Sequence, residues 1–434
     1  MLVSWGVLLA GLAYVGLLFA VATWGDRASA ARQGSRGPRP LIYALSLGVY
    51  CTSWTYFGSV GEATRTGFGF FAIYLGPILL FVFGWRLISL IVAIAKRENI
   101  ASIADFIAAR YGKNQSLGAL VTVIAVFGVV PYISIQLKAL SSSLETMMLA
   151  SGWTASALSA GPMGSNLAAL VTVALAAFAI LFGTRHIDTT EHQDGMIMAV
   201  AVESVVKLMA LIIVGLFVTF TMSGGPGHFI DLMEARRDIG AVFTTAPDYG
   251  RLITMVVLST FAIILLPRQF HVMVVENSSR SDVRRAAVLF PIYLVAINIF
   301  VVPIAIAGMG MASGADADTF VLALPVAAGN TVMAMVAYIG GVSAATAMVI
   351  VETIALSIMV SNNLFVPLFL ARNRIIGAPQ EDMGQSLLVI RRWTIAGILI
   401  LAYAYYWMAG TSAALAQTGL LSFAAVAQFA PAFF

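Results

Sequence analysis

The sequence predicts an all-α polytopic membrane protein, and the reasons are its composition and its long apolar runs. Of the 434 residues, 60% are apolar and 10% are charged, whereas a soluble domain has roughly 25% charged residues. About eleven apolar runs are long enough to cross a bilayer, because a spanning helix needs about 20 residues. This composition excludes a soluble globular protein and a disordered chain. The net charge of +4 is too small to indicate a nucleic-acid-binding patch.

The predicted spans follow one another along nearly the whole chain. They lie near residues 3–24, 41–61, 68–95, 117–148, 165–183, 194–222, 251–274, 287–311, 330–369, 386–408 and 412–434. The first run lacks a basic leading segment and a small-residue cleavage site, so it is interpreted as a retained helix and not as a signal peptide. Residues 99–112 have apolar side chains at helical spacing, which predicts a short amphipathic helix on the inner membrane surface. Residues 226–250 form the longest predicted outer loop.

The distribution of positive charge predicts the orientation of the chain. Arg27, Arg32, Arg36 and Arg39 follow the first span, and basic residues gather in cytoplasmic loops. We therefore expect this loop inside and the N-terminus outside. The loops at 150–164 and 312–329 contain no Lys or Arg, as expected of outer loops.

Cysteine and histidine give no sign of a metal centre, and no cofactor is expected. Cys51 is the only cysteine in the sequence, which excludes an internal disulfide and a cysteine metal cluster. The histidines at 186, 192, 228 and 271 do not have the HExxH spacing of a zinc site.

Two spans contain residues that interrupt a helix. The second has glycines and hydroxyl side chains between residues 48 and 61, and the seventh has Pro267, which removes a helical hydrogen bond. These spans are five apart and run in opposite directions, which predicts a transporter of two inverted five-helix repeats with its solute site at the paired breaks. The alternative is that Gly and Pro are simply common in membrane helices. The predicted solute-binding residues are Thr52, Ser53, Trp54, Thr55, Phe57, Gln269, Phe270 and His271.

Charged residues inside the spans mark a second candidate site. Glu203 and Lys207 are four residues apart in the sixth span and share one helix face. A charge within the membrane is costly and indicates a function, although a purely structural ion pair is the alternative. Glu352 in the ninth span has no partner that the sequence identifies. The small residues Gly340 to Ala347 of that span favour either close helix packing or a cation site at Ser343.

These segments resemble the sodium:solute symporter family, which has a leucine-transporter-type core preceded by one extra helix. The resemblance is carried by residues 51–67, by the segment Thr190 to Gly195, by Gln269-Phe270 and by Gly340 to Ala347. A narrower likeness, over residues 184–196, 201–208, 266–277, 290–308 and 419–431, is to the transporter-like input domain of membrane sensor histidine kinases of the CbrA kind. It implies a bacterial inner membrane protein.

The resemblance also implies how transport is coupled to an ion. In sodium-coupled members, the sodium ligands would correspond to the carbonyls of Gly48 and Cys51 and to hydroxyls at Ser343 and position 344. Ala344 lacks the hydroxyl, and Glu191 stands where the family has an aspartate. Some proton-coupled members of the wider fold place a lysine of the fifth core helix near the vacant sodium site, as Lys207 would be. We therefore expect H+ as the coupling ion rather than Na+.

The function predicted by the sequence is a transporter-like membrane module that binds and translocates a small polar solute. By resemblance the solute is an amino acid such as histidine, and the module is the input domain of a sensor histidine kinase whose catalytic domains would follow residue 434. The chain itself has no P-loop, phosphoacceptor-histidine motif or ATP lid, so no enzymatic activity is expected. The alternatives are a free-standing sodium- or proton-coupled symporter and a sensor that binds without transporting. The expected division is an extra helix and cytoplasmic loop at 1–40, a first repeat at 41–222, an outer loop at 223–250 and a second repeat at 251–434.

Overall fold

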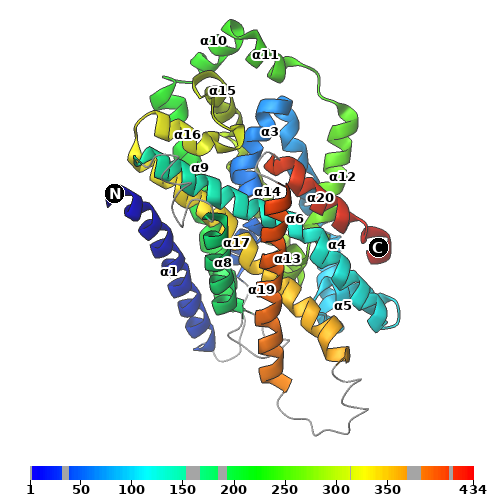
Figure 1. Ribbon diagram of the computed structural model, residues 1–434. Coiled ribbons are helices and arrows are strands. Elements are labelled where there is room, and N and C mark those ends of the chain that lie inside the picture. Colours follow the sequence, from blue (N-terminus) through cyan, green and yellow to red (C-terminus); the bar gives the residue numbers. More distant parts are fainter. Residues whose placement is uncertain are drawn as a thin grey trace.

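The computed structural model describes residues 2–31, 39–152, 167–183, 193–312, 314–368, 383–409 and 414–434. Within these residues every regular element is a helix, and no strand occurs. Figure 1 shows the helices packed side by side into one bundle. The long helices are α1 (Leu2–Ala30), α4 (Ala72–Arg97), α6 (Gln115–Ala150), α8 (Leu167–Gly183), α9 (Asp194–Leu216), α12 (Tyr249–Leu265), α14 (Arg280–Asn298), α15 (Val301–Met311), α17 (Thr331–Val360), α19 (Met383–Ala409) and α20 (Leu415–Ala427).

The prediction of a polytopic helical membrane protein is confirmed. Among the described residues, seven helices are long and apolar enough to cross a membrane, or eight if one bent pair counts as a span. The other predicted spans appear as shorter or interrupted helices at the expected places. For example, the predicted span 165–183 is α8, and the predicted span 412–434 is α20 followed by α21 (Ala430–Phe433).

The second predicted span is broken as expected. Helix α2 (Pro40–Ser46) continues as the tight turn η1 (Leu47–Tyr50), and the chain then becomes extended at Cys51, with φ −82° and ψ 96°. The helix resumes in the wider turn η2 (Trp54–Gly58) and in α3 (Ser59–Thr66). The N–H of Cys51 still bonds to the carbonyl of Gly48 at 3.0 Å. The regular helical ladder is nevertheless interrupted at Cys51, in a segment where every residue is buried.

The seventh predicted span is broken too, and proline explains where. Helix α12 ends at Leu265, and the backbone of the following Leu266 is extended with φ −64° and ψ 130°. The short helix α13 (Pro267–Phe270) begins immediately, with proline in its first turn, where no N–H is needed. It continues as the wider turn η5 (His271–Val275). The two interrupted helices are thus the second and the seventh predicted spans, as the sequence predicted.

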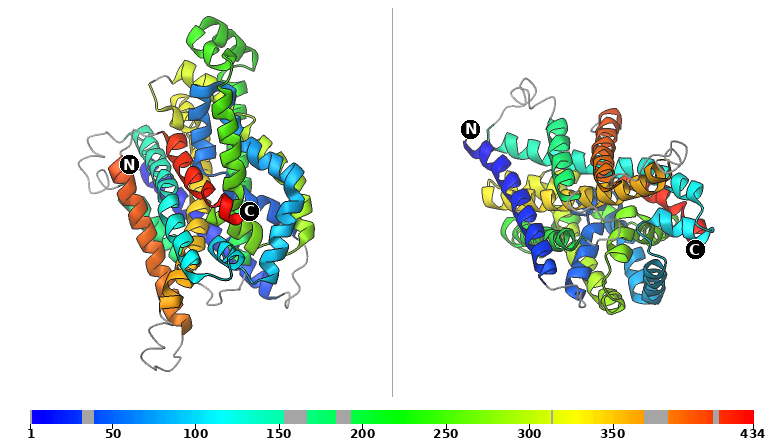
Figure 2. Two further views of the ribbon diagram at one scale, coloured as in Figure 1. Left: turned by 90° about the vertical axis from the view of Figure 1, so that its right-hand side faces the viewer. Right: turned by 90° about the horizontal axis from the view of Figure 1, so that it is seen from below.

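Helix α17 is at the centre of the bundle and α1 at its edge. In the most apolar stretch of each helix, 83% of the stretch is buried in α17 but only 22% in α1. In Figure 1 and in the right-hand view of Figure 2, α1 lies along the outside of the bundle. One face of α1 is buried at Val7, Tyr14 and Leu18, while the exposed remainder suits contact with lipid.

A glycine brings the first break close to α9. A Cβ atom at Gly48 would lie 3.0 Å from the Cβ of Ser204 and 3.1 Å from the ring of Tyr293. Since any larger residue would push these elements apart, glycine lets η1 approach α9 and α14 at backbone distance. The carbonyls of the break consequently lie against the side chains of α9.

The predicted surface helix exists as α5 (Ile103–Arg110), and its apolar face packs inward. Ile103 and Ile107 are fully buried, and Phe106 stacks on Phe433 of α21 with ring centroids 4.5 Å apart. The predicted outer loop contains two short helices, α10 (Gly227–Ala235) and α11 (Arg237–Thr244), which lie together at one end of the bundle (Figure 1).

Candidate functional site

The side chain of Lys207 binds the carbonyls of the first break. Its Nζ atom donates to the oxygen of Gly48 at 2.7 Å and to that of Cys51 at 2.6 Å, and the side chain is completely buried. An ammonium out of water needs acceptors, and the Cys51 carbonyl at the break needs a donor, while that of Gly48 also accepts from the Cys51 N–H at 3.0 Å. Each requirement satisfies the other. The ammonium thus bonds to the two carbonyls that the sequence assigned to sodium, so these residues do not fit a sodium ion while Lys207 is in place.

The carboxylate of Glu203 is directed to a different helix. Its Oε1 accepts from Thr346 at 2.7 Å, and its backbone oxygen accepts from the hydroxyl of Ser343 at 2.9 Å. The hydroxyl of Ser343 in turn accepts from Tyr14 at 2.8 Å. Glu203 and Lys207 share one face of α9, as predicted, but their hydrogen bonds tie that face to α17 and to η1 respectively. Ser343, a predicted cation ligand, is engaged by α9 and α1.

The hydroxyl groups of the first break are held by α6. Thr52 Oγ1 lies 3.0 Å from the hydroxyl of Tyr132, and the Ser53 hydroxyl donates to Gln136 Oε1 at 2.5 Å. The backbone N–H of Trp54 donates to Thr52 Oγ1 at 3.2 Å. These contacts give the unwound segment one defined conformation and orient it toward α6.

The second break carries a buried ion pair that the sequence did not predict. Arg268 Nη1 donates to Glu352 Oε2 at 2.5 Å, and both side chains are 0% exposed. The guanidinium carbon lies 4.5 Å from the ring centroid of Tyr132. The structure places the Arg268 side chain completely inside the bundle. It also gives Glu352 the partner that could not be named.

Tyr132 brings the two breaks together. Its hydroxyl reaches Thr52 of the first break, and its ring lies under Arg268 of the second. Next to Arg268, both polar atoms of the Gln269 side chain are buried without a hydrogen-bond partner. Thr52, Tyr132 and Arg268 therefore belong to one buried polar region, and Gln269 is the next residue along the second break.

The remaining predicted solute-binding residues lie around this region or away from it. Phe270 packs in an aromatic cluster with Phe106 and Phe433. His271 Nε2 lies 3.4 Å from Glu276 Oε1. The ring of Phe57 contacts Tyr56 edge to face, at 4.9 Å between centroids.

Of the other predicted site residues, Trp54 and Thr55 are described by the structure and Glu191 is not. Trp54 donates through its indole N–H to the carbonyl of Ala416 at 3.2 Å, and Thr55 is buried. Glu191 lies outside the described residues, so its predicted part in ion coupling has no structural counterpart here.

Ion pairs join α3 to neighbouring elements at one end of the bundle. Glu62 of α3 pairs with Arg251 of α12 and, at 3.4 Å, with Arg65. Arg65 also lies 3.9 Å from Asp318, whose other carboxylate oxygen accepts from the N–H of Leu415 at 2.9 Å. These contacts join α3, α12, the turn η6 (Ala317–Thr319) and α20. A hollow of about 10 Å³ lies beside Phe57, lined also by Asp318 and Leu415.

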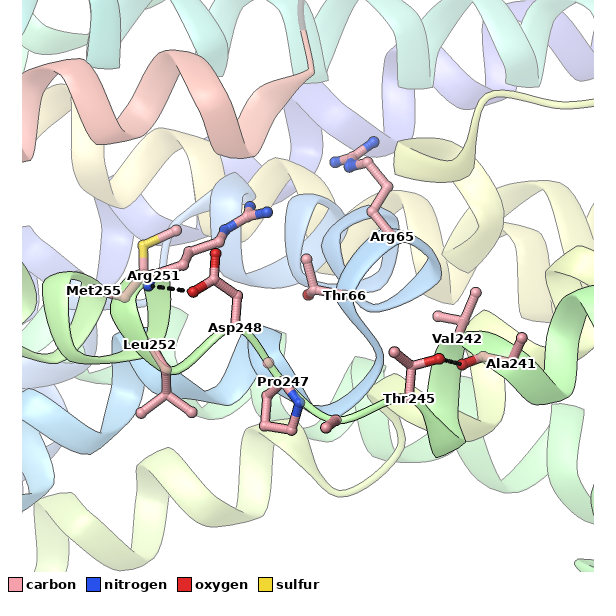
Figure 3. Close-up of a pocket in the computed structure, with 12 residues that line it drawn as sticks. Arg65, Thr66, Ala241, Val242, Thr245, Pro247, Asp248, Arg251, Leu252 and Met255 are labelled. Atoms are coloured by element: carbon pink, nitrogen blue, oxygen red, sulfur yellow. Dashed lines mark hydrogen bonds between the residues drawn. The ribbon is translucent and has the colours of Figure 1, made fainter.

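A larger cavity lies outside these ion pairs. It has a volume of about 400 Å³, and residues from α3, α11 and the start of α12 surround it (Figure 3). Its two cations, Arg65 and Arg251, are already paired with carboxylates. The cavity shares no lining residue with the polar region at the breaks and is thus separate from it.

Tyr14, Tyr132, Gln136 and Arg268 are the site residues that sequence reasoning missed. Gln136 and Arg268 are polar residues inside apolar spans, which is a sign of function that was available from the sequence. The two tyrosines had no such signal, because membrane helices often contain tyrosine as an ordinary packing residue.

Comparison with known proteins supports the fold. No family model matches the sequence. An uncharacterized symporter of Bacillus subtilis (strain 168), YhjB, is 22% identical over 290 residues, which are 65% of this chain and 54% of that protein. The matched stretch thus spans about half the length of that symporter.

A solved structure covers the whole chain. It is a Na+-coupled sialic acid symporter in a substrate-bound, outward-open state, with a TM-score of 0.69 at 12% identity over 100% of this chain and 87% of that one. The chain therefore has the predicted leucine-transporter-type fold of two inverted five-helix repeats with an extra N-terminal helix. Both similar proteins are named as symporters, and neither is named as a sensor kinase.

Proposed function

We propose that this chain is a proton-coupled symporter of a small polar solute and that Lys207 is the coupling group. The observation that carries the proposal is the pair of hydrogen bonds from Lys207 Nζ to Gly48 and Cys51. The protonated amine holds the unwound segment against α9. Loss of the proton removes the charge and one donor, so the tie weakens and the first core helix can move relative to α9. Proton binding then biases the equilibrium between the two access states.

The same contacts favour H+ over Na+. A sodium ion would have to displace a covalently attached cation from the carbonyls of Gly48 and Cys51. Ala344 offers no hydroxyl, and the hydroxyl of Ser343 is bonded to Glu203 and Tyr14. A sodium site with Glu191 and Ser343 as ligands remains the competing proposal, because Na+ is the coupling ion named for the sialic acid symporter.

The solute is proposed to bind between the two breaks. Thr52 and Ser53 lie on one side, Gln269 on the other, and Tyr132 touches both breaks. Phe57, Phe270 and His271 are proposed to flank this region at its outer and inner ends. The buried amide of Gln269 lacks partners, and a polar solute supplies them.

The alternative proposal is that the chain is the input domain of a sensor histidine kinase, with histidine as its solute. It is supported by the resemblance of segments such as 201–208 and 266–277 to sensors of the CbrA kind. The free-standing symporter fits the two similar proteins better. For either proposal, the setting is a bacterial inner membrane with the N-terminus outside. The repeats are proposed to be residues 41–222 and 251–434.

Uptake into proteoliposomes tests the proposed coupling. The purified chain is reconstituted, and uptake of radiolabelled amino acids is measured under an imposed pH gradient or an imposed sodium gradient. Accumulation is expected to follow the pH gradient and to be lost in Lys207→Ala. Lys113→Ala, which removes an exposed lysine that is 77% accessible, is the control and is expected to behave as wild type. Uptake that needs sodium, survives collapse of the pH gradient and tolerates Lys207→Ala would show the proposal to be wrong.

A further inference from the structure

Arg268 has donors that nothing in the described structure uses. A guanidinium carries five N–H donors in one plane. Of these, Nη1 binds Glu352, whereas Nε and Nη2 are buried without a hydrogen-bond partner. Leaving donors of a buried charged group unpaired is costly. The side chain is nevertheless completely buried, which indicates that these donors serve a group that arrives from outside.

The unused donors lie on one edge of the guanidinium. Nε–H and one N–H of Nη2 point in the same direction, side by side, at the spacing of the two oxygens of a carboxylate. Glu352 takes the opposite end of the group, and the ring of Tyr132 lies against its face at 4.5 Å. The guanidinium is thus held in place by contacts that leave this edge free, so little rotational freedom remains to be lost on binding.

The charges of the region favour a ligand group with one negative charge over a group with two. Arg268 and Glu352 neutralise each other, so an entering carboxylate shares the arginine and leaves the region with a net charge of about −1. A doubly charged phosphate would add a second negative charge without a partner, in a bundle where unpaired charge is expensive. Two further buried polar groups have no partner, namely Oε1 of Glu352, on the carboxylate that binds the arginine, and the amide of Gln269, the next residue in the chain. They can receive the polar or cationic remainder of the solute.

We propose that the transported solute is a carboxylic acid, bound through its carboxylate to the Nε–Nη2 edge of Arg268. The inference rests on the proposed function, because it assumes that a solute enters the region between the breaks. Thr52 of the first break is joined to the same place through Tyr132. Tyr132 therefore links the arginine that would hold the carboxylate to the first interrupted helix.

Paired acids and amides test the inference on the wild-type chain. Thermal denaturation of the full purified chain is recorded with proline, alanine, histidine and lactate, and with the four corresponding amides. At least one acid is expected to stabilise the protein and to be taken up by proteoliposomes. Its amide, which keeps the shape but lacks the second acceptor oxygen and the charge, is expected to bind at least tenfold more weakly.

Substitutions test whether Arg268 is the residue that distinguishes the acid from its amide. Arg268→Lys keeps the positive charge but loses the planar edge, so affinity for the acid is expected to fall by about 10- to 100-fold while affinity for the amide stays unchanged. Arg391→Lys is the matched control. Arg391 is also buried and also has unpartnered Nε and Nη2 atoms, but it lies on α19. If Arg268→Lys does not fold, Arg268→Gln combined with Glu352→Gln removes the edge without leaving a charge unpaired.

The outcomes separate the inference from the proposed function. An amide that binds and is taken up as well as its acid, or an Arg268→Lys protein that discriminates as the wild type does, overturns the inference and leaves the symporter intact. Loss of discrimination in Arg391→Lys as well as in Arg268→Lys also overturns it, because the effect would then be general. Absence of binding and uptake for all eight compounds counts against both.

Discussion

Converting the lysine-held break into a sodium site is the sharpest test of the proposed coupling. The perturbation is Lys207→Ala together with Ala344→Ser. The first change frees the carbonyls of Gly48 and Cys51, and the second restores the hydroxyl that the symporter family provides beside Ser343. If the ammonium stands in the place of a cation, the double variant should bind sodium where the wild type does not.

The magnitude follows from the hydrogen bonds that are lost. Lys207→Ala removes the donor of the buried Cys51 carbonyl, whereas the carbonyl of Gly48 keeps the N–H of Cys51 at 3.0 Å. One unpaired buried carbonyl costs about 1–3 kcal/mol, so stability should fall by about that amount. Sodium at 100 times its dissociation constant would return about 2.7 kcal/mol. The ion should therefore recover a large part of the lost stability in the double variant.

Thermal denaturation in sodium chloride and in choline chloride at equal ionic strength measures this effect. The wild type and Ala344→Ser should denature at the same temperature in both salts, since Lys207 keeps its place. The double variant should be more stable in sodium than in choline. Equal stabilisation of the wild type and the double variant by sodium would refute the reasoning, because the cation would then bind without displacing the lysine.

Three further predictions concern the orientation of the chain, the ion pairs of Glu62 and the contact between α9 and α17. A cysteine at Ser35, which lies outside the described residues, should resist an impermeant thiol reagent in intact cells, and ready labelling would reverse the predicted orientation. Glu62→Gln removes the carboxylate that two arginines share, so deuterium exchange in α3 should become faster, whereas unchanged exchange would show that the ion pairs do not hold the outer end. Thr346→Val should lower stability by about 1–3 kcal/mol, because Glu203 Oε1 loses its donor. Thr353→Val, whose hydroxyl binds only backbone carbonyls of its own helix, is the control and should cost less.

The sequence was sufficient for the fold class and for the position of both breaks. Length and apolarity determine which segments can span a membrane, and Pro267 and the residues around Cys51 disturb a helix through local backbone chemistry. Such rules act within a few residues of the chain. They predicted the interrupted helices at Cys51 and Leu266 that the structure contains.

The partners of the site residues could not be predicted in this way. Arg268 and Glu352 are 84 positions apart, and Thr52 and Tyr132 are 80 apart. Only the packing of whole helices brings them together. The spacing of Glu203 and Lys207 placed both on one face of the sixth span. It could not reveal the close approach of η1 at Gly48, which brings two carbonyls within hydrogen-bond distance of Lys207.

Because the Lys207 ammonium is covalently attached, it is present at the first break whatever the salt concentration of the medium. A sodium ion at this site would be co-transported with the solute and released on the opposite side of the membrane in each cycle. Its supply would depend on the salinity of the medium. Under the proposed coupling, Lys207 stays behind when its cycle ends and only its proton is exchanged. A carrier of this design would run equally well at low and high salinity and would respond to the acidity of its surroundings instead.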